Sequence, residues 1–263
     1  MDYFTIHLFI GIIAGVMAGM FGIGGGVVIV PALIIFSGFS LIQANGTSLA
    51  ALLLPVAIFA VISYYKAGLI NLKYSFWLAL GLAIGVLFGS LFALSAPISL
   101  LKLFYGIFLL YISWSFMQPI ELWRKYILRN VNPSKKVIHK ENLNFPGYLM
   151  VLVGITAGVL SGMFGIGGGL VIVPVLTAIL HFDTKKAIGT SLGALLLPVG
   201  LPGVILYHNA GQLSPSHAVP VAIGLLIGSI VGAKITIAIP TLTVKRLYSV
   251  FLLIMGLNFI FRS

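Results

Sequence analysis

Acidic residues are almost absent from this sequence of 263 residues, which contains four aspartates and glutamates and no cysteine. The missing cysteines exclude disulfides and thiolate metal sites. None of the four acids lies within an apolar stretch, so we expect neither a buried carboxylate proton relay nor an intramembrane aspartyl protease. The motifs GxxxxGK[ST] and HExxH are missing too, which excludes a phosphate-loop ATPase and a zinc protease of that type. We therefore expect no enzyme, no cofactor and no metal site.

Charged residues of either sign are also scarce, at 7% of the chain against 60% hydrophobic residues. A soluble domain has about 25% charged residues, so this chain lacks the polar surface that water requires. Apolar stretches near or above the roughly 20 residues that span a bilayer follow one another along the chain. The sequence therefore predicts an all-α polytopic membrane protein surrounded by lipid. Its net charge of +11 comes from basic residues in the connections, which indicates membrane topology rather than nucleic-acid binding.

One motif, GMFGIGGG, occurs twice, at residues 19–26 and 162–169, and interrupts an apolar run each time. Glycine in a helix interior costs about 1 kcal/mol against alanine, so each copy predicts a helix break. The second copy lies 143 residues after the first. The same offset pairs Gly46-Thr47-Ser48-Leu49 with Gly189-Thr190-Ser191-Leu192, Pro55 with Pro198, and Gly81, Gly85 and Gly89 with Gly224, Gly228 and Gly232. The chain is therefore an internal duplication.

The duplication predicts two membrane repeats, residues 1–117 and 148–263, joined by a basic hydrophilic linker at 118–147. In the first repeat we expect apolar helices at 4–20, at 27–42, from Gln43 to about Tyr65, at 74–95 and at 99–117. The arms that follow the glycine breaks contain prolines and either span the membrane or re-enter it. We therefore expect about five membrane segments per repeat and 8–10 membrane helices in total. Glycines four apart predict close packing against another helix.

The positions of the basic residues favour inverted repeats over parallel ones. Five crossings per repeat and a cytoplasmic linker place the connections at 66–73, 181–187 and 240–246 in the cytoplasm as well. With the linker, these connections contain twelve of the fifteen Lys and Arg residues, as the positive-inside tendency requires. Four crossings per repeat would make the repeats parallel and would place the basic residues of the last two connections outside. We therefore expect inverted repeats with both chain ends outside.

Inverted repeats with broken helices are typical of secondary transporters, whose substrates bind near the midplane at the repeat interface. A helix that restarts after a glycine break has unpaired amide groups and a positive dipole end, which favour an anion. The Thr-Ser pairs near the start of a later helix add hydroxyl groups. The predicted substrate-binding residues are Gly24, Gly25, Gly26, Thr47, Ser48, Gly167, Gly168, Gly169, Thr190 and Ser191, with Asn45 and Lys234 as further candidates.

These motifs have structural alternatives. A glycine break can serve tight helix packing alone, and a Ser or Thr before a helix can be a simple N-cap. Lys234 lies near the end of its apolar run, where its ammonium group can reach the membrane interface. His181, His208 and His217 lie at predicted helix ends in the second repeat, where an interfacial position is favoured over proton coupling. The depth of the two breaks, which either meet at the midplane or lie at opposite faces, is left open.

The paired segments GxxxGxxxGxFGIGGGxxxVP, each followed by GTS and a proline-containing helix, resemble the sulfite exporter TauE/SafE family of membrane permeases. The resemblance covers nearly the whole chain. It implies transport of small sulfur-containing anions, such as sulfite, sulfonates or sulfoacetate, across the bacterial inner membrane. The repeats differ at Gln43 (Lys186) and Asn45 (Ile188), so the site is expected to be asymmetric.

The expected function is thus a secondary permease that carries a small anion by alternating access around the glycine breaks. An anion channel and a non-transporting membrane scaffold or assembly protein are the alternatives. The coupling ion is left open between H⁺ and Na⁺, as are the direction of transport and the oligomeric state.

Overall fold

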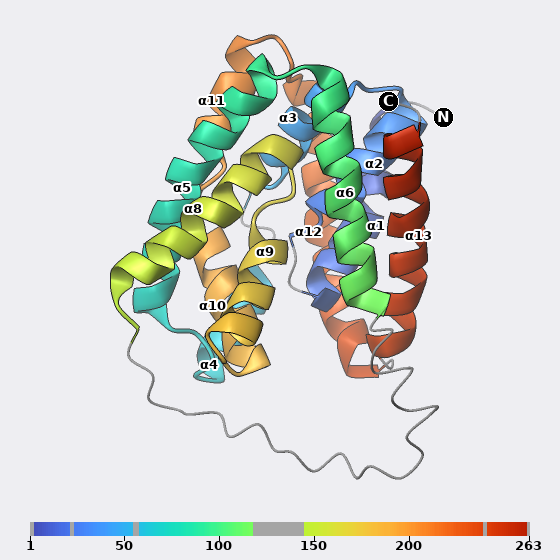
Figure 1. Ribbon diagram of the computed structural model, residues 1–263. Coiled ribbons are helices and arrows are strands. Elements are labelled where there is room, and N and C mark those ends of the chain that lie inside the picture. Colours follow the sequence, from blue (N-terminus) through green and yellow to red (C-terminus); the bar gives the residue numbers. More distant parts are fainter. Residues whose placement is uncertain (1–2, 22–23, 55–57, 118–144, 239–240, 262–263) are drawn as a thin grey trace, which may run out of the picture. The chain divides into compact units, whose positions relative to one another are not determined.

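The computed structural model in Figure 1 describes residues 3–21, 24–54, 58–117, 145–238 and 241–261. Every regular element in these ranges is helical, which confirms the all-helical prediction. The linker predicted at 118–147 lies almost entirely outside the described residues. The chain forms two compact units, of which unit 1 comprises Met1–Ala96 and Glu141–Ala238, and unit 2 comprises Pro97–Lys140 and Ile239–Ser263. Both halves of the sequence therefore contribute to both units.

The helix bounds recur with the offset of 143 residues. In unit 1 the first half of the chain supplies α1 (Tyr3–Phe21), α2 (Gly26–Ser37), α3 (Leu41–Ala51), α4 (Ile58–Lys66) and α5 (Leu72–Ser95). The second half supplies α8 (Gly147–Phe164), α9 (Gly169–Pro174), the π-helix η1 (Val175–Ile179), α10 (Thr184–Leu195), α11 (Leu201–Asn209) and α12 (Pro215–Ala238). Unit 2 contains α6 (Ile98–Met117) and α13 (Thr241–Phe261). The bounds of α4 and α5 coincide with those of α11 and α12 at this offset.

The single helix expected from Gln43 to about Tyr65 is wrong, because α3 ends at Ala51 and α4 begins at Ile58. The second half has the same interruption between α10 and α11, and Pro198 lies inside it. Proline has no amide proton, and its ring clashes with the carbonyl four residues earlier, so the helix ends before the proline. Both interrupted helices begin with a side-chain cap, Ser40 for α3 and Asp183 for α10.

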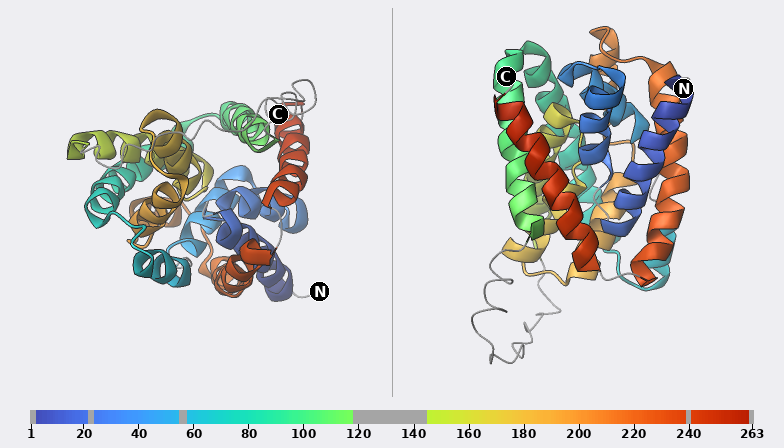
Figure 2. Two further views of the ribbon diagram at one scale, coloured as in Figure 1. Left: turned by 90° about the horizontal axis from the view of Figure 1, so that it is seen from below. Right: turned by 90° about the vertical axis from the view of Figure 1, so that its right-hand side faces the viewer.

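Two pairs of long helices dominate unit 1, with α1 beside α12 and α5 beside α8 (Figures 1 and 2). Glycines let the backbones touch, since a Cβ added to Gly85 would lie 2.2 Å from the Ile155 carbonyl oxygen. A Cβ on Gly228 would lie 2.1 Å from the Ile12 carbonyl oxygen. These contacts confirm the close helix packing that the glycine spacing predicts. Each pair is parallel and takes one helix from each half of the chain, and the two pairs run in opposite directions (Figure 1).

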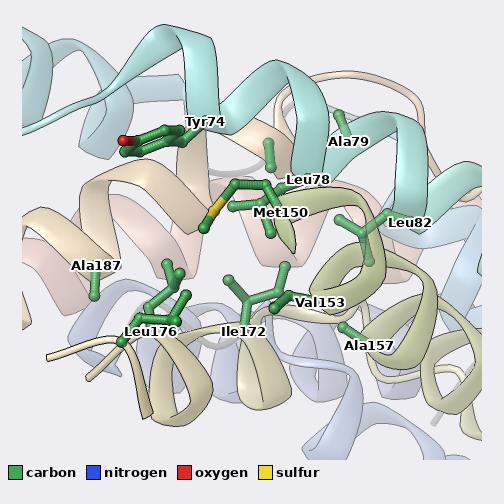
Figure 3. Packing of buried hydrophobic residues seen from close by; sticks show 12 residues of the cluster. Tyr74, Leu78, Ala79, Leu82, Met150, Val153, Ala157, Ile172, Leu176 and Ala187 are labelled. Atoms are coloured by element: carbon green, nitrogen blue, oxygen red, sulfur yellow. The ribbon is translucent and has the colours of Figure 1, made fainter. Parts of the chain in front are cut away.

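Within the described ranges, three helical stretches are long and apolar enough to cross a membrane: Leu72–Ser95, Gly147–Phe164 and Pro215–Gly232. Large hydrophobic side chains are exposed along the helices, as at Phe88, which is 59% exposed. Such a surface suits contact with lipid and confirms a membrane-embedded protein. Between the helices, α5, α8, α9 and η1 enclose a buried apolar cluster that includes Leu78, Met150 and Ile172 (Figure 3).

In its described part, unit 2 is an antiparallel pair of helices, α6 and α13. The rings of Tyr105 in α6 and Phe259 in α13 contact each other edge to face, with centroids 5.1 Å apart. Nearer the other end of the pair, Ser113 Oγ donates a hydrogen bond to the Ser249 carbonyl oxygen at 2.7 Å. This hydrogen bond satisfies a buried hydroxyl group between two apolar helices.

Candidate substrate site at the glycine breaks

The two glycines that precede the restarted helix have the same backbone conformation in both breaks. The φ angles are 83° and 78° at Gly24 and Gly25, and 81° and 77° at Gly167 and Gly168. Glycine adopts this left-handed region freely, whereas it costs other residues about 1–2 kcal/mol. Gly25 caps α2 and Gly168 caps α9, and neither glycine offers a side-chain acceptor to the first amide groups of its helix.

The two breaks lie against each other within unit 1. A Cβ on Gly26 would lie 2.2 Å from the Gly165 carbonyl oxygen and 2.6 Å from Ile166 Cα. A Cβ on Gly24 would lie 3.5 Å from the Ile166 carbonyl oxygen and 4.0 Å from Gly167 Cα. Sequence alone left open whether the breaks meet. They do meet, through backbone contacts that a side chain at Gly26 would prevent.

Leucine side chains pack against the cap glycines at equivalent positions in the two halves. A Cβ on Gly25 would lie 3.0 Å from Leu225 Cδ2, and one on Gly168 would lie 2.6 Å from Leu82 Cδ2. Leu225 lies 143 residues after Leu82, so the two contacts are equivalent. The cap glycines therefore serve packing as well as the turn, which is the structural role that the sequence left open beside the binding role.

Helix α3 carries polar residues to the second break. Ser48 Oγ donates a hydrogen bond to the Gly165 carbonyl oxygen at 2.6 Å, and Asn45 Nδ2 donates one to the Met163 carbonyl oxygen at 2.6 Å. These carbonyls follow or end α8, where helix carbonyls have no partner within their own helix. The single hydroxyl proton of Ser48 is therefore engaged by the protein itself.

Thr190 of α10 also has protein partners. Its Oγ1 accepts a hydrogen bond from the Asn71 amide at 3.2 Å, and its carbonyl oxygen accepts one from Ser75 Oγ at 2.8 Å. Asn71 is the N-cap of α5. Thr190 thus holds the start of α5, which is a structural role for one of the predicted site residues.

Three buried polar atoms of the predicted site have no hydrogen-bond partner within the described part of the chain: Thr47 Oγ1, Ser191 Oγ and Asn45 Oδ1. Each of these side chains is at most 1% exposed. An unpaired buried polar group costs about 1–3 kcal/mol and is rare in folded proteins. Each Gly-Thr-Ser motif therefore has one hydroxyl that serves the fold and one that has no partner among the described residues, and the two roles are exchanged between the halves.

The sequence did not assign Tyr207 of α11 to the site, although its alignment with Tyr64 was visible at the offset of 143. The Tyr207 side chain is fully buried, and its hydroxyl donates a hydrogen bond to the Gly162 carbonyl oxygen at 2.8 Å. A Cβ on Gly46 would lie 3.0 Å from Tyr207 Cβ. Tyr207 thus links the end of α8 to α3 beside the second break.

Among the predicted residues, the structure brings Gly24, Gly26 and Gly167 together and places Asn45 and Ser48 close behind the second break. Thr190 has its described contacts at the start of α5. Lys234 lies in α12, and its side chain is not among those that the structure describes.

Known membrane proteins resemble this chain over nearly its whole length. The family model described as sulfite exporter TauE/SafE matches residues 7–259. The chain is 26% identical to the probable membrane transporter protein YunE of Bacillus subtilis, over 99% of this chain and 98% of that protein. It is 29% identical to a probable membrane transporter protein of Methanocaldococcus jannaschii, over 95% of this chain and 92% of that protein.

A probable membrane transporter protein of Haemophilus influenzae is 27% identical, over 97% of each chain. No solved structure matches. Because the family match runs through both glycine breaks and both Gly-Thr-Ser motifs, the chain belongs to the sulfite exporter TauE/SafE family of membrane transporters.

Proposed function

We propose that this protein is a secondary transporter of a small oxyanion that contains sulfur, such as sulfite, a sulfonate or sulfoacetate. The anion binds at the two glycine breaks, and alternating access exposes the site to each side of the cell membrane in turn. The observations that carry the proposal are the contact between the two breaks and, on α3 and α10, two buried hydroxyls that have no described partner, Thr47 and Ser191. The sulfur in the substrate rests on the family to which the chain belongs.

The chemistry of these groups suits an anion rather than a cation. A hydroxyl group without an acceptor can donate its proton to an oxyanion, and the first amides of α2 point their positive dipole end at the break. In a low-dielectric surrounding such hydrogen bonds to a charged acceptor are worth roughly twice a neutral one. Hydroxyl groups and backbone amides can thus stabilise the charge of the substrate, so that no lysine within the membrane is needed.

Inverted repeats are part of this proposal. At the offset of 143 residues, α1 corresponds to α8 and α12 corresponds to α5, so each pair is the counterpart of the other. The two pairs run in opposite directions (Figure 1). Two halves related in this way rock against each other around a central site in many transporters. The proposal places the protein in the cell inner membrane, with the linker at 118–147 in the cytoplasm and both chain ends outside.

The test is a flux experiment with purified protein in liposomes. Sulfite, thiosulfate, sulfonates, sulfoacetate and anions without sulfur are supplied as labelled substrates. We expect saturable uptake and counterflow for at least one sulfur oxyanion. The double variant Thr47→Val/Ser191→Ala should raise the half-saturation concentration about tenfold or more, because two hydroxyl donors are lost.

The exposed Ser95 provides the control, because its hydroxyl group bonds only within α5. Ser95→Ala should transport as the unchanged protein does. Large single-channel currents without counterflow would instead indicate a channel. A folded protein that moves none of these anions would contradict the proposal.

A further inference from the structure

Two histidines that are 210 residues apart in sequence form a pair at the far end of α2 from the first glycine break. The ring centroids of His7 in α1 and His217 in α12 lie 4.9 Å apart. His7 is fully buried, whereas His217 is partly exposed. Phe39 contacts both rings, at 5.8 Å from His7 and 5.2 Å from His217. The pair thus extends from the protein surface into the interior of unit 1.

The hydrogen bonds of His7 fix its tautomer. His7 Nδ1 lies 2.6 Å from the Tyr3 carbonyl oxygen, which can only accept, so Nδ1 carries a proton. His7 Nε2 lies 3.2 Å from Ser37 Oγ, at the last residue of α2. In the neutral ring, Nε2 accepts the hydroxyl proton of Ser37. Nε2 is therefore the atom of His7 that is free to take up a further proton.

The equivalent place in the other half contains no histidine. At the offset of 143 residues, Met150 replaces His7, Tyr74 replaces His217 and Phe182 replaces Phe39. Met150 and Tyr74 lie together in the buried apolar cluster of Figure 3, and the rings of Tyr74 and Phe182 lie 5.8 Å apart. Neither methionine nor tyrosine exchanges a proton near neutral pH. The histidine pair therefore exists at one end of a molecule whose two halves are otherwise closely alike.

We infer that His7 and His217 bind the proton whose movement is coupled to transport. This inference rests on the proposed transport function and names H⁺ as the coupling ion. Histidine is the residue whose ordinary protonation range lies at physiological pH. Sodium ions prefer oxygen ligands, and the pair offers ring nitrogens. The described residues hold no group of three or more metal-binding side chains, so the pair does not form a larger metal site there.

The short distance between the two rings favours one bound proton over two. Two imidazolium rings at this distance repel each other strongly in a low-dielectric surrounding, so the pair holds one added proton rather than two. The described residues bring one further titratable group to the pair, the phenol of Tyr3, whose ring lies 6.5 Å from His217. The loop residue Phe39 and the α2 residue Ser37 add no charge. Asp2 lies outside the described residues.

Helix α2 connects the proton site with the substrate site. Protonation of His7 turns Nε2 into a donor, so Ser37 Oγ must accept and its own proton must find another acceptor. This exchange takes place at the last residue of α2, whose first residue, Gly26, contacts the second break. The twelve residues of α2 thus connect the histidine pair directly with the contact between the breaks. Proton binding can therefore alter the packing between the two breaks.

The test uses substitutions that the other half of the chain already accommodates. The double variant His7→Met/His217→Tyr copies Met150 and Tyr74, and His208→Gln removes an exposed histidine of α11 as a control. All proteins are reconstituted in liposomes with the anion that shows the strongest counterflow among sulfite, sulfoacetate and thiosulfate. Uptake is measured with and without a transmembrane pH gradient, and proton flux is measured with an entrapped pH dye.

We expect the double variant to keep counterflow without a gradient but to lose at least tenfold in gradient-driven accumulation and in anion-dependent proton flux. His208→Gln should keep all three activities. NMR of histidine-labelled protein in micelles should show His7 and His217 taking up one proton between them at roughly pH 5 to 8.

Full gradient-driven accumulation by the double variant, or rings that do not titrate in that range, would overturn the inference. An unchanged protein without counterflow for any anion contradicts the transport function instead, and the NMR titration then still decides the proton site.

Discussion

Ser48 and Ser191 occupy equivalent positions in the two halves, yet their hydroxyl groups have different surroundings. Ser48 Oγ bonds to the Gly165 carbonyl oxygen, whereas Ser191 Oγ has no partner among the described residues. A binding role therefore suits Ser191 better, and a structural role suits Ser48.

Substitution by alanine should separate the two roles through stability. Ser48→Ala leaves the buried Gly165 carbonyl without its donor and should cost about 1–3 kcal/mol. Ser191→Ala removes an unpaired hydroxyl and should leave stability unchanged or slightly raised. The melting temperatures of the two variants in detergent, without substrate, measure the difference. Equal losses in both variants would contradict this assignment.

The sequence could single out the Thr-Ser pairs as candidates for a site, because both occur at the same place in a duplicated chain. It could not predict which hydroxyl is engaged. That depends on which carbonyl lies opposite, and Gly165 comes from a segment 117 residues away from Ser48. The sequence also could not predict the contact between His7 and His217, because α1 and α12 are distant in sequence.

At the scale of helices, glycine determines which surfaces touch. Gly81, Gly85 and Gly89 predicted a contact face on α5, and the structure confirms that face. The sequence could not predict the partner, because four helices carry such faces and any two of them could pack closely. The partner of α5 is α8, from the other half of the chain.

Gly85→Ala should weaken this helix pair. The added Cβ would meet the Ile155 carbonyl oxygen at 2.2 Å and Gly158 Cα at 2.8 Å, both of which are backbone atoms. We expect a loss of roughly 1–3 kcal/mol or more from overpacking. In an isolated helix the same change would be favourable by about 1 kcal/mol, so a loss identifies the contact between helices.

Leu80→Ala on the same helix is the matched control, because the Leu80 side chain is 40% exposed on the outer surface of α5. It should change the melting temperature little. A Gly85→Ala variant as stable as the unchanged protein would contradict the close packing of α5 and α8.

At the scale of the whole chain, each half is incomplete without the other. Both long helix pairs of unit 1 combine one helix from each half, and each of α3 and α10 contacts a long helix of the opposite half. The glycine breaks meet only because the halves are interleaved in this way. Interleaving also explains how a chain with few charged residues can bury polar groups in its interior: backbone groups of one half pair with side chains of the other.

The inverted arrangement of the two halves can be tested with single cysteines, because the chain contains none. Lys66 ends α4 and Asn209 ends α11; these residues are equivalent at the offset of 143, and both are exposed. Inverted repeats place them on opposite sides of the membrane. A membrane-impermeant maleimide should therefore label Asn209→Cys in intact cells and Lys66→Cys only after the membrane is opened.

Lys73→Cys and Ser216→Cys form a second equivalent pair, also exposed, and should repeat the pattern of Lys66 and Asn209. The unchanged protein should remain unlabelled in every condition. Because these residues end α4 and α11 or lie in the first turn of α5 and α12, the side of the membrane on which each is labelled fixes the direction of four helices at once. Labelling of both members of a pair from the same side would require parallel repeats. The helix pairs α1·α12 and α5·α8 would then not be related by inversion, and the rocking of the two halves about a shared centre would be contradicted.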